Sequence, residues 1–223
     1  MDLQLNKTKM RILVITAVPL ERDTVVRGLK GDPNFDVLAA GVGSVAVAIN
    51  TAKALAASEY GLVVSAGIGG GFPGRAEVGS IVVANEIIAA DLGAETPEGF
   101  ISLDELGFGS ARVQVDKVLV NIVTEALQKA KLSVNNGPAL TVSTVTGTAE
   151  SAAKLTTRVP GAACEAMEGY GAALAAVGWG LPVLEIRAIS NLVGPRDRTA
   201  WRIQEALDAL ESASSILLEV LLK

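Results

Sequence analysis

The stretch LVVSAGIGGGFPG, residues 62–74, indicates both the fold of this chain and the place of its site. Residues 62–65 read as a short, strongly apolar strand, and a glycine-rich run follows them. In open α/β sheets, ligands bind beyond the carboxyl ends of strands, and glycines let the backbone approach a ligand closely. We therefore expect a buried strand followed by a loop that contacts a ligand, with Ile68 and Gly69 among the contacts. The alternative is a flexible loop without a functional role.

Strand and helix patterns alternate on both sides of this stretch. Short β-branched runs are separated by Ala-rich helical runs, which is typical of a largely parallel sheet covered by helices on both faces. We expect strands at residues 11–16, 35–40, 62–65, 80–90, 140–145 and 183–190. We expect helices at residues 21–29, 45–58, 117–130, 149–155, 168–177 and 198–222. Residues 91–109 have no clear period, which predicts a loop that serves as a substrate lid or a subunit contact.

The organisation of the 223 residues predicts a single domain at residues 10–223, because the sequence has no repeat, low-complexity tract or linker. Residues 1–9 are expected to form a frayed extension, and the short apolar run after them lacks the cleavage pattern of a signal peptide. Mean hydropathy is +0.43, which raises the question of a membrane span. The longest charge-free apolar run, residues 169–184, is interrupted by Gly and Pro and is shorter than the about 20 residues of a span. We expect a buried helix, a turn and a strand there, and no membrane partner.

The composition excludes several mechanisms. The chain has no His, so a Ser-His-Asp or Cys-His relay and a His-ligated metal site are impossible. Its one Cys can form neither an internal disulfide nor a thiolate cluster, which predicts a reducing, cytoplasmic compartment. A net charge of −5 argues against nucleic acid as a partner. Any chemistry therefore uses carboxylates, amides, hydroxyls, Arg, Lys or backbone groups.

The stretch GVGSVA, residues 41–46, follows a predicted strand and opens a helix, as the dinucleotide-binding pattern does. That pattern also requires an acidic residue at the end of the next strand to bind a ribose, and residues 62–65 contain none. A tight turn from strand to helix is the better interpretation.

Four segments carry a resemblance to a known family, and they occur in the family's order. They are TAVPLE at residues 16–21, VGSIVV at 78–83, AMEG at 166–169 and RAISN at 187–191. Together they resemble the nucleoside phosphorylase and nucleosidase superfamily over nearly the whole chain. Within it, residues 71–76, 91–95 and 190–201 resemble the futalosine hydrolases. The resemblance implies a three-layer α/β/α sandwich with a mixed, largely parallel sheet, homo-oligomers, a purine nucleoside as the partner, and no metal or organic cofactor.

The resemblance also assigns roles around the sugar. Hydrolysis of an N-glycosidic bond passes through a ribosyl cation, so the site needs an activated water and negative charge near the sugar. Glu21 matches the carboxylate that orients the water, where phosphorylases tend to carry a phosphate-binding Arg. Glu168 matches the carboxylate that accepts hydrogen bonds from the ribose hydroxyls, and Met167 packs on the sugar face. The alternatives are a carboxylate placed to favour the helix dipole for Glu21 and a core residue for Met167.

Asn191 predicts the identity of the base. Nucleosidases of this family that release adenine carry Asp here, and an Asn amide cannot deliver a proton. A 6-oxopurine spreads the developing negative charge onto O6, so donated hydrogen bonds can assist its departure. The resemblance and this amide point to futalosine as substrate and hypoxanthine as leaving base, a step that serves menaquinone synthesis in the resembling family. An Asx turn is the alternative for Asn191.

Supporting roles follow from the same resemblance. Arg187 is expected near the water and sugar, Ser190 orients the side chain that faces the base, and Thr146 and Gly147 line the base pocket. Trp201 and Arg196 are expected to close over the site, and Phe72 or Phe100 to stack on the base. Three other functions stay open: a nucleosidase for methylthioadenosine and adenosylhomocysteine, a phosphorylase, and a non-catalytic nucleoside sensor on the same fold.

Overall fold

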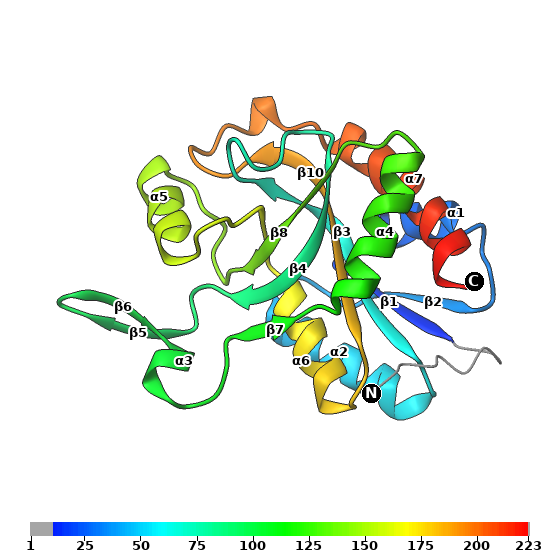
Figure 1. Cartoon of the computed structure of the whole chain (residues 1–223), viewed down its shortest axis with the longest axis horizontal. Coiled ribbons are helices and arrows are strands. Elements are labelled where there is room, and N and C mark those ends of the chain that lie inside the picture. Colours follow the sequence, from blue (N-terminus) through cyan, green and yellow to red (C-terminus); the bar gives the residue numbers. More distant parts are fainter. Residues whose placement is uncertain (1–10, 223) are drawn as a thin grey trace.

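The computed structural model describes residues 11–222 and places an eight-stranded sheet between two groups of helices (Figure 1). The predicted extension at residues 1–9 lies outside the described residues. All six predicted strands are present, and two short ones, β7 and β9, join them. The sheet consists of β1 Ile12–Thr16, β2 Phe35–Ala39, β3 Leu62–Gly71, β4 Ile81–Ala89, β7 Arg112–Gln114, β8 Val134–Thr141, β9 Cys164–Ala166 and β10 Val183–Leu192.

The pairing of the strands confirms a mixed, largely parallel sheet. Parallel pairings join β2, β1, β3 and β10 in that order, and they also join β4, β8 and β9. Antiparallel pairings join β10 to β4, β4 to β7, and β9 to β3. Because β9 pairs with the end of β3, strands β3, β10, β4, β8 and β9 form a closed ring. The sheet therefore curls round at the end where β3 and β10 finish.

All six predicted helices are present, and five of them cover the two faces of the sheet (Figure 1). One group is α1 Pro19–Gly28, α4 Lys117–Lys129 and α7 Ile203–Leu221, and the other is α2 Ser44–Ala57 and α6 Gly169–Gly178. Helix α5 Ala149–Arg158 packs on a smaller core cluster that includes Phe72. The predicted helix at residues 198–222 is divided into a 3₁₀ turn at Arg198–Ala200 and α7, which begins at Ile203. The three-layer prediction is confirmed.

The glycine run differs from its prediction, because β3 does not end at residue 65 but continues to Gly71. The reason is close packing across a strand. A Cβ at Gly67 would lie 2.7 Å from Oε1 of Glu21 and 2.8 Å from Nη1 of Arg187. The glycines therefore lie within an extended strand, where the lack of side chains leaves room for large polar side chains from other elements. Only the residues after Gly71 form the turn.

Strand β8 also differs, since it covers Val134–Thr141 where residues 140–145 were predicted. Its first half contains Asn135 and Asn136, and a prediction based on apolar residues does not recognise such a polar stretch as a strand. The Asn136 side chain donates hydrogen bonds to Oγ1 of Thr124 on α4 and to the carbonyl of Val83 on β4. These contacts satisfy a polar side chain in a strand that pairs with β4 along its whole length.

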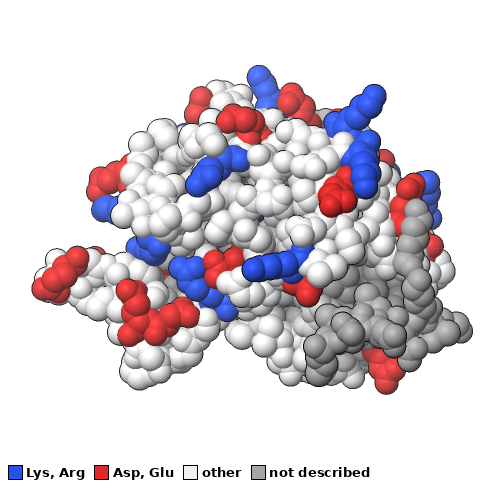
Figure 2. Space-filling view, in the orientation of Figure 1, with Lys and Arg blue, Asp and Glu red and all other residues white. Residues whose placement is uncertain are grey.

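Residues 91–109 are not a structureless loop. They form a hairpin, β5 Gly93–Thr96 with β6 Gly99–Ser102, followed by the one-turn helix α3 Leu103–Leu106, whose first turn is capped by Ser102. The hairpin stands out from the body of the molecule (Figure 1). This segment has five acidic and no basic residues, and Figure 2 shows its acidic side chains on the projection. None of its residues lines the cavity described below, so the structure gives no support to a lid.

The apolar run at residues 169–184 has the predicted form, with α6, a turn and the start of β10. Seven of the ten residues of α6 are buried. No helix within residues 11–222 combines the length and the apolar character that crossing a membrane requires.

Candidate active site

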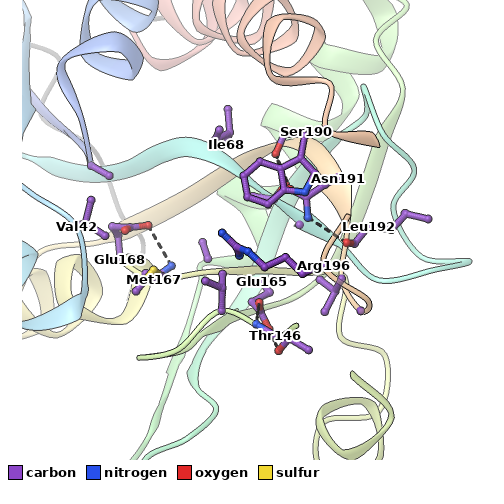
Figure 3. Close-up of a pocket in the computed structure, with 18 of the residues that line it drawn as sticks. Val42, Ile68, Thr146, Glu165, Met167, Glu168, Ser190, Asn191, Leu192 and Arg196 are labelled. Atoms are coloured by element: carbon purple, nitrogen blue, oxygen red, sulfur yellow. Dashed lines mark hydrogen bonds between the residues drawn. The ribbon is translucent and has the colours of Figure 1, made fainter. Parts of the chain in front are cut away.

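A cavity of about 370 Å³ lies at the carboxyl ends of β3 and β10, beside β9 (Figure 3). It occupies the position at which open α/β sheets bind ligands. Most of the predicted site residues line it, although they come from five separate segments of the chain. They are Glu21, Ile68, Gly69, Thr146, Met167, Glu168, Ser190 and Asn191.

Two predicted site residues lie outside the cavity lining. Gly147 follows Thr146, and its carbonyl accepts a hydrogen bond from the Arg196 backbone at 3.1 Å. Arg187 is only 1% exposed and lies behind the wall formed by Glu21 and Glu168. Gly147 therefore supports the rim of the site, and Arg187 acts on the site through its neighbours.

Glu21 is held in the first turn of α1 by three backbone N–H groups. Its Oε2 accepts from Ala17 at 2.9 Å and from Val18 at 3.3 Å, and its Oε1 accepts from Ile68 on β3 at 2.9 Å. Pro at the start of α1 fixes the entry of the helix. Glu21 thus lies in the first turn of its helix, where a carboxylate favours the helix dipole, and it also presents a carboxylate to the cavity. A carboxylate held by three donors has little freedom to turn away from the cavity.

Glu168 is the second carboxylate of the cavity, and 6% of it is exposed. Its Oε2 accepts from the Met167 backbone at 3.1 Å, and its Oε1 accepts from the Gly43 backbone at 3.3 Å. Gly43 belongs to the turn at residues 41–46, which has the predicted form of a tight passage from β2 into α2. That turn therefore supplies a donor to a site carboxylate.

Arg187 lies among three carboxylates. Its Nε donates to Oε1 of Glu185 at 2.8 Å, its Nη2 donates to Oγ of Ser65 at 2.9 Å, and its Nη1 lies 3.5 Å from Oε2 of Glu168. Burial acts to lower the pKa of Arg187, but the charges of Glu185, Glu168 and Glu21 outweigh it and raise that pKa above its ordinary value. The guanidinium therefore stays charged, and it lies between a tight contact with Glu185 and a loose one with Glu168.

Asn191 lies in β10, which continues to Leu192, so its backbone is strand and not an Asx turn. Ser190 Oγ donates to Oδ1 of Asn191 at 2.9 Å, and Nδ2 of Asn191 donates to the Leu192 carbonyl at 3.0 Å (Figure 3). Nδ2 carries two hydrogens, so one remains as a donor after the bond to Leu192. The amide borders Gly70 closely, since a Cβ there would lie 3.3 Å from Nδ2.

Glu165 also lines the cavity, although no role was predicted for it from the sequence. It is 3% exposed, its Oε1 accepts from the Thr146 backbone at 2.8 Å, and its Oε2 accepts from the Thr146 hydroxyl. Burial raises the pKa of Glu165 above its ordinary value. Gly70 pairs with Glu165 on one side and with Asn191 on the other, so the two side chains lie on the same face of the sheet. One indication of this residue was present in the sequence, since Glu165 lies only three positions before Glu168.

The remaining wall of the cavity is apolar and includes Val42, Val145, Leu192, Val193 and Trp201. The Arg196 guanidinium lies 5.1 Å from the centre of the Trp201 ring, a cation–π distance. Both residues line the cavity, where they were expected to close over it. Phe72 is buried in the smaller core cluster and Phe100 lies against Arg158, so the aromatic ring of the lining is that of Trp201.

Within residues 11–222, no group of three or more Asp, Glu, Cys or His side chains is arranged to hold a metal ion. The chemistry available in the cavity comes from two oriented carboxylates, a third carboxyl group of raised pKa and an amide donor.

Comparison with known proteins identifies the family. Residues 12–223 match the phosphorylase superfamily. The chain belongs to this superfamily. The futalosine hydrolase of Streptomyces coelicolor is 50% identical and covers 95% of this chain and 97% of its own length. The futalosine hydrolase of Acidothermus cellulolyticus is 46% identical over 92% of this chain and 89% of its own length. The predicted resemblance is therefore confirmed.

Solved structures of the superfamily show the same fold. The 5′-methylthioadenosine/S-adenosylhomocysteine nucleosidase of S. pneumoniae, solved with a transition-state inhibitor, matches with a TM-score of 0.81 over 95% of this chain and 100% of that one. The corresponding nucleosidase of Neisseria meningitidis matches with a TM-score of 0.80. Their sequence identities are 20% and 17%, so they bear on the fold alone. The superfamily's α/β fold with a mixed sheet is confirmed.

Proposed function

We propose that this chain is a nucleosidase that hydrolyses the N-glycosidic bond of futalosine, with hypoxanthine and dehypoxanthine futalosine as the products. The observation that carries this proposal is the 50% identity to the futalosine hydrolase of S. coelicolor over 95% of the chain. Two further futalosine hydrolases, at 46% and 34% identity, support it. The arrangement of carboxylates and amide in the cavity suits the same reaction.

The proposed reaction begins with a water held by Glu21. The bond between C1′ of the ribose and N9 of the base breaks, and its electron pair leaves with the base. The water oxygen then forms the new bond to C1′ while its proton passes to Glu21. The departing base anion takes up a proton from solvent to become neutral hypoxanthine, and Glu21 returns its proton to solvent. Glu168 accepts hydrogen bonds from the ribose hydroxyls, and its negative charge stabilises the ribosyl cation that forms between these two events.

Charge favours water over phosphate as the attacking group. Glu21 and Glu168 both line the cavity, while the buried cation Arg187 is already engaged by Glu185 and Ser65. A phosphate dianion beside C1′ would therefore meet two carboxylates, whereas the guanidinium of Arg196 in the cavity lining lies against the Trp201 ring. This arrangement supports hydrolysis rather than phosphorolysis.

The leaving base is assigned from Asn191. Ser190 donates to Oδ1 of its amide and one Nδ2 hydrogen goes to Leu192, which leaves the second Nδ2 hydrogen to donate to a ligand. Donated hydrogen bonds stabilise the charge that develops on N7 and O6 of a 6-oxopurine. An adenine leaving group depends more on a proton from an acid, which an amide does not have. We therefore place hypoxanthine against Asn191.

Three further properties belong to this proposal. We infer from the resemblance that the chain assembles as a homo-oligomer, which light scattering after size-exclusion chromatography tests. The single Cys, which can form no internal disulfide, supports a cytoplasmic location. Release of hypoxanthine from futalosine would place the protein in menaquinone synthesis.

The experiment is incubation with futalosine in phosphate-free buffer, followed by chromatography of the products. Stoichiometric release of hypoxanthine at a rate unchanged by added phosphate is expected. A rate that requires phosphate would mean a phosphorylase, and tight binding of futalosine without turnover would mean a sensor.

A further inference from the structure

Glu185 is a buried carboxylate that the proposed reaction does not use. It lies in β10 between Leu184 and Ile186, and 1% of it is exposed. Its Oε1 accepts the 2.8 Å hydrogen bond from Nε of Arg187, and its Oε2 has no hydrogen-bond partner within residues 11–222. Placing a charge in a central strand is costly, and an apolar side chain would suit the position as it suits the two neighbours.

The backbone next to Glu185 is shaped to admit this carboxylate. Gly169 is the first residue of α6 and directly follows Glu168. A Cβ at Gly169 would lie 2.2 Å from Oε2 of Glu185, so a larger residue there would force the Glu185 carboxylate to shift. The glycine at position 169 leaves the carboxylate in the place where it meets Arg187.

Arg187 separates Glu185 from the two carboxylates of the cavity. The guanidinium makes its tight contact with Glu185 at 2.8 Å and its loose contact with Glu168 at 3.5 Å. Its Nη1 and the Oε1 of Glu21 both border the space above Gly67. Because the attraction between charges grows as their distance falls, Glu185 takes the largest share of the positive charge, and the cavity carboxylates keep most of their negative charge.

We propose that Glu185 is a positioning residue that holds the Arg187 guanidinium away from Glu168. Glu168 then stays free to accept the ribose hydroxyls, and net negative charge remains beside the ribosyl cation. The kinetic consequences rest on the proposed hydrolysis, whereas the structural consequence does not. Without the Glu185 carboxylate, the guanidinium turns to the next carboxylate within reach, which is Glu168, and neutralises it.

Two variants and a control test this role. Glu185→Gln keeps the size of the side chain and an oxygen for Nε but removes the charge, and Glu185→Leu matches the apolar neighbours in the strand. Glu86→Gln is the control, because Glu86 pairs with Arg112 at 3.0 Å on the same sheet and does not line the cavity. In crystal structures of both Glu185 variants, Nη1 of Arg187 is expected to approach Oε2 of Glu168 from 3.5 Å to about 2.8 Å.

The kinetic expectation is a fall in kcat of roughly ten- to a hundredfold with a smaller change in KM, because the uncharged ground-state ribose senses the lost charge less than the cation does. Glu86→Gln should stay within about twofold of the parent. In an Arg187→Gln background, Glu185→Gln should cause little further loss, since its effect passes through the arginine.

An unchanged separation between Arg187 and Glu168 in both variants would overturn the proposal. So would an equal loss of kcat in the parent and Arg187→Gln backgrounds. If the parent chain leaves futalosine intact, the proposed function fails, and the crystal structures still decide the role of Glu185. If the Gln variant does not fold, the Leu variant carries the test, both alone and in the Arg187→Gln background.

Discussion

Gly67 and Arg187 meet where β3 passes beneath the site, since a Cβ on Gly67 would lie 2.8 Å from Nη1 of the arginine. The same Cβ would lie 2.7 Å from Glu21, so one bare position on a strand leaves room for both charged groups. The charged groups of the site therefore pack directly against the backbone of β3 at a position that has no side chain. This explains why a run of glycines and a set of carboxylates occur together in this chain.

Gly67→Ala is expected to displace Glu21 or Arg187, because neither side chain can retreat from a buried position without losing its hydrogen bonds. We expect a loss of about 1–3 kcal/mol in the free energy of unfolding and a fall in activity that exceeds the loss of folded protein. Urea denaturation and steady-state kinetics measure the two effects. Gly178→Ala is the control, because a Cβ there meets nothing within 4 Å at the end of α6, and it should leave the activity unchanged.

Glu21→Gln is expected to reduce kcat by about 10²–10⁴-fold, because the amide keeps an oxygen for the Ile68 backbone but cannot take a proton from water. Binding of futalosine, measured by calorimetry, should change little. Glu125→Gln, on the exposed face of α4, provides the control. A Glu21→Gln variant with parental kcat would exclude Glu21 as the base.

Asn191→Asp is expected to change the base that leaves. A protonated Asp can deliver a proton to N7, so release of adenine from methylthioadenosine should rise by about tenfold or more, and should rise further as the pH falls toward the ordinary pKa of Asp. Cleavage of futalosine should fall in the same variant. Chromatography of the released bases at several pH values measures this, with Asn121→Asp on α4 as the control. An unchanged ratio of the two bases would contradict the role given to the amide.

Glu165→Gln is expected to change how stability depends on pH. Burial raises the pKa of Glu165 in the folded protein, so the folded chain holds this proton more tightly than the unfolded chain does. As the pH rises above about 4.3, the usual pKa of Glu, the parent should lose stability relative to the Gln variant, until the folded-state pKa is passed. Urea denaturation across this range measures the difference, and parallel curves for the two proteins would contradict the assignment.

Much of this site could be predicted because its residues occur in ordered local segments. Glu21 follows the first strand, Glu168 opens a helix, and Asn191 ends a strand, so each lies at a point that an alternating α/β pattern already brings to one edge of the sheet. The strands and helices themselves followed from apolar periodicity. Where the pattern was interrupted by polar residues, as at Asn135 and Asn136 in β8, the boundary was missed.

What the sequence did not reveal depends on pairs of residues that are far apart in the chain. Strand β9 has three residues and exists because it pairs with β3 and β8, which no local pattern indicates. Glu165 and Glu185 acquire their roles from Thr146 and Arg187, contacts that only the folded chain defines. The glycines of β3 looked like a loop, because the side chains that require them come from other elements.

The most direct measurement of the central claim is a comparison of kcat/KM for futalosine, inosine and methylthioadenosine in phosphate-free buffer. A purine nucleosidase with Asn191 against the base should prefer futalosine, release hypoxanthine from it, and cleave methylthioadenosine poorly. A higher kcat/KM for methylthioadenosine than for futalosine, with adenine as the released base, would contradict the account.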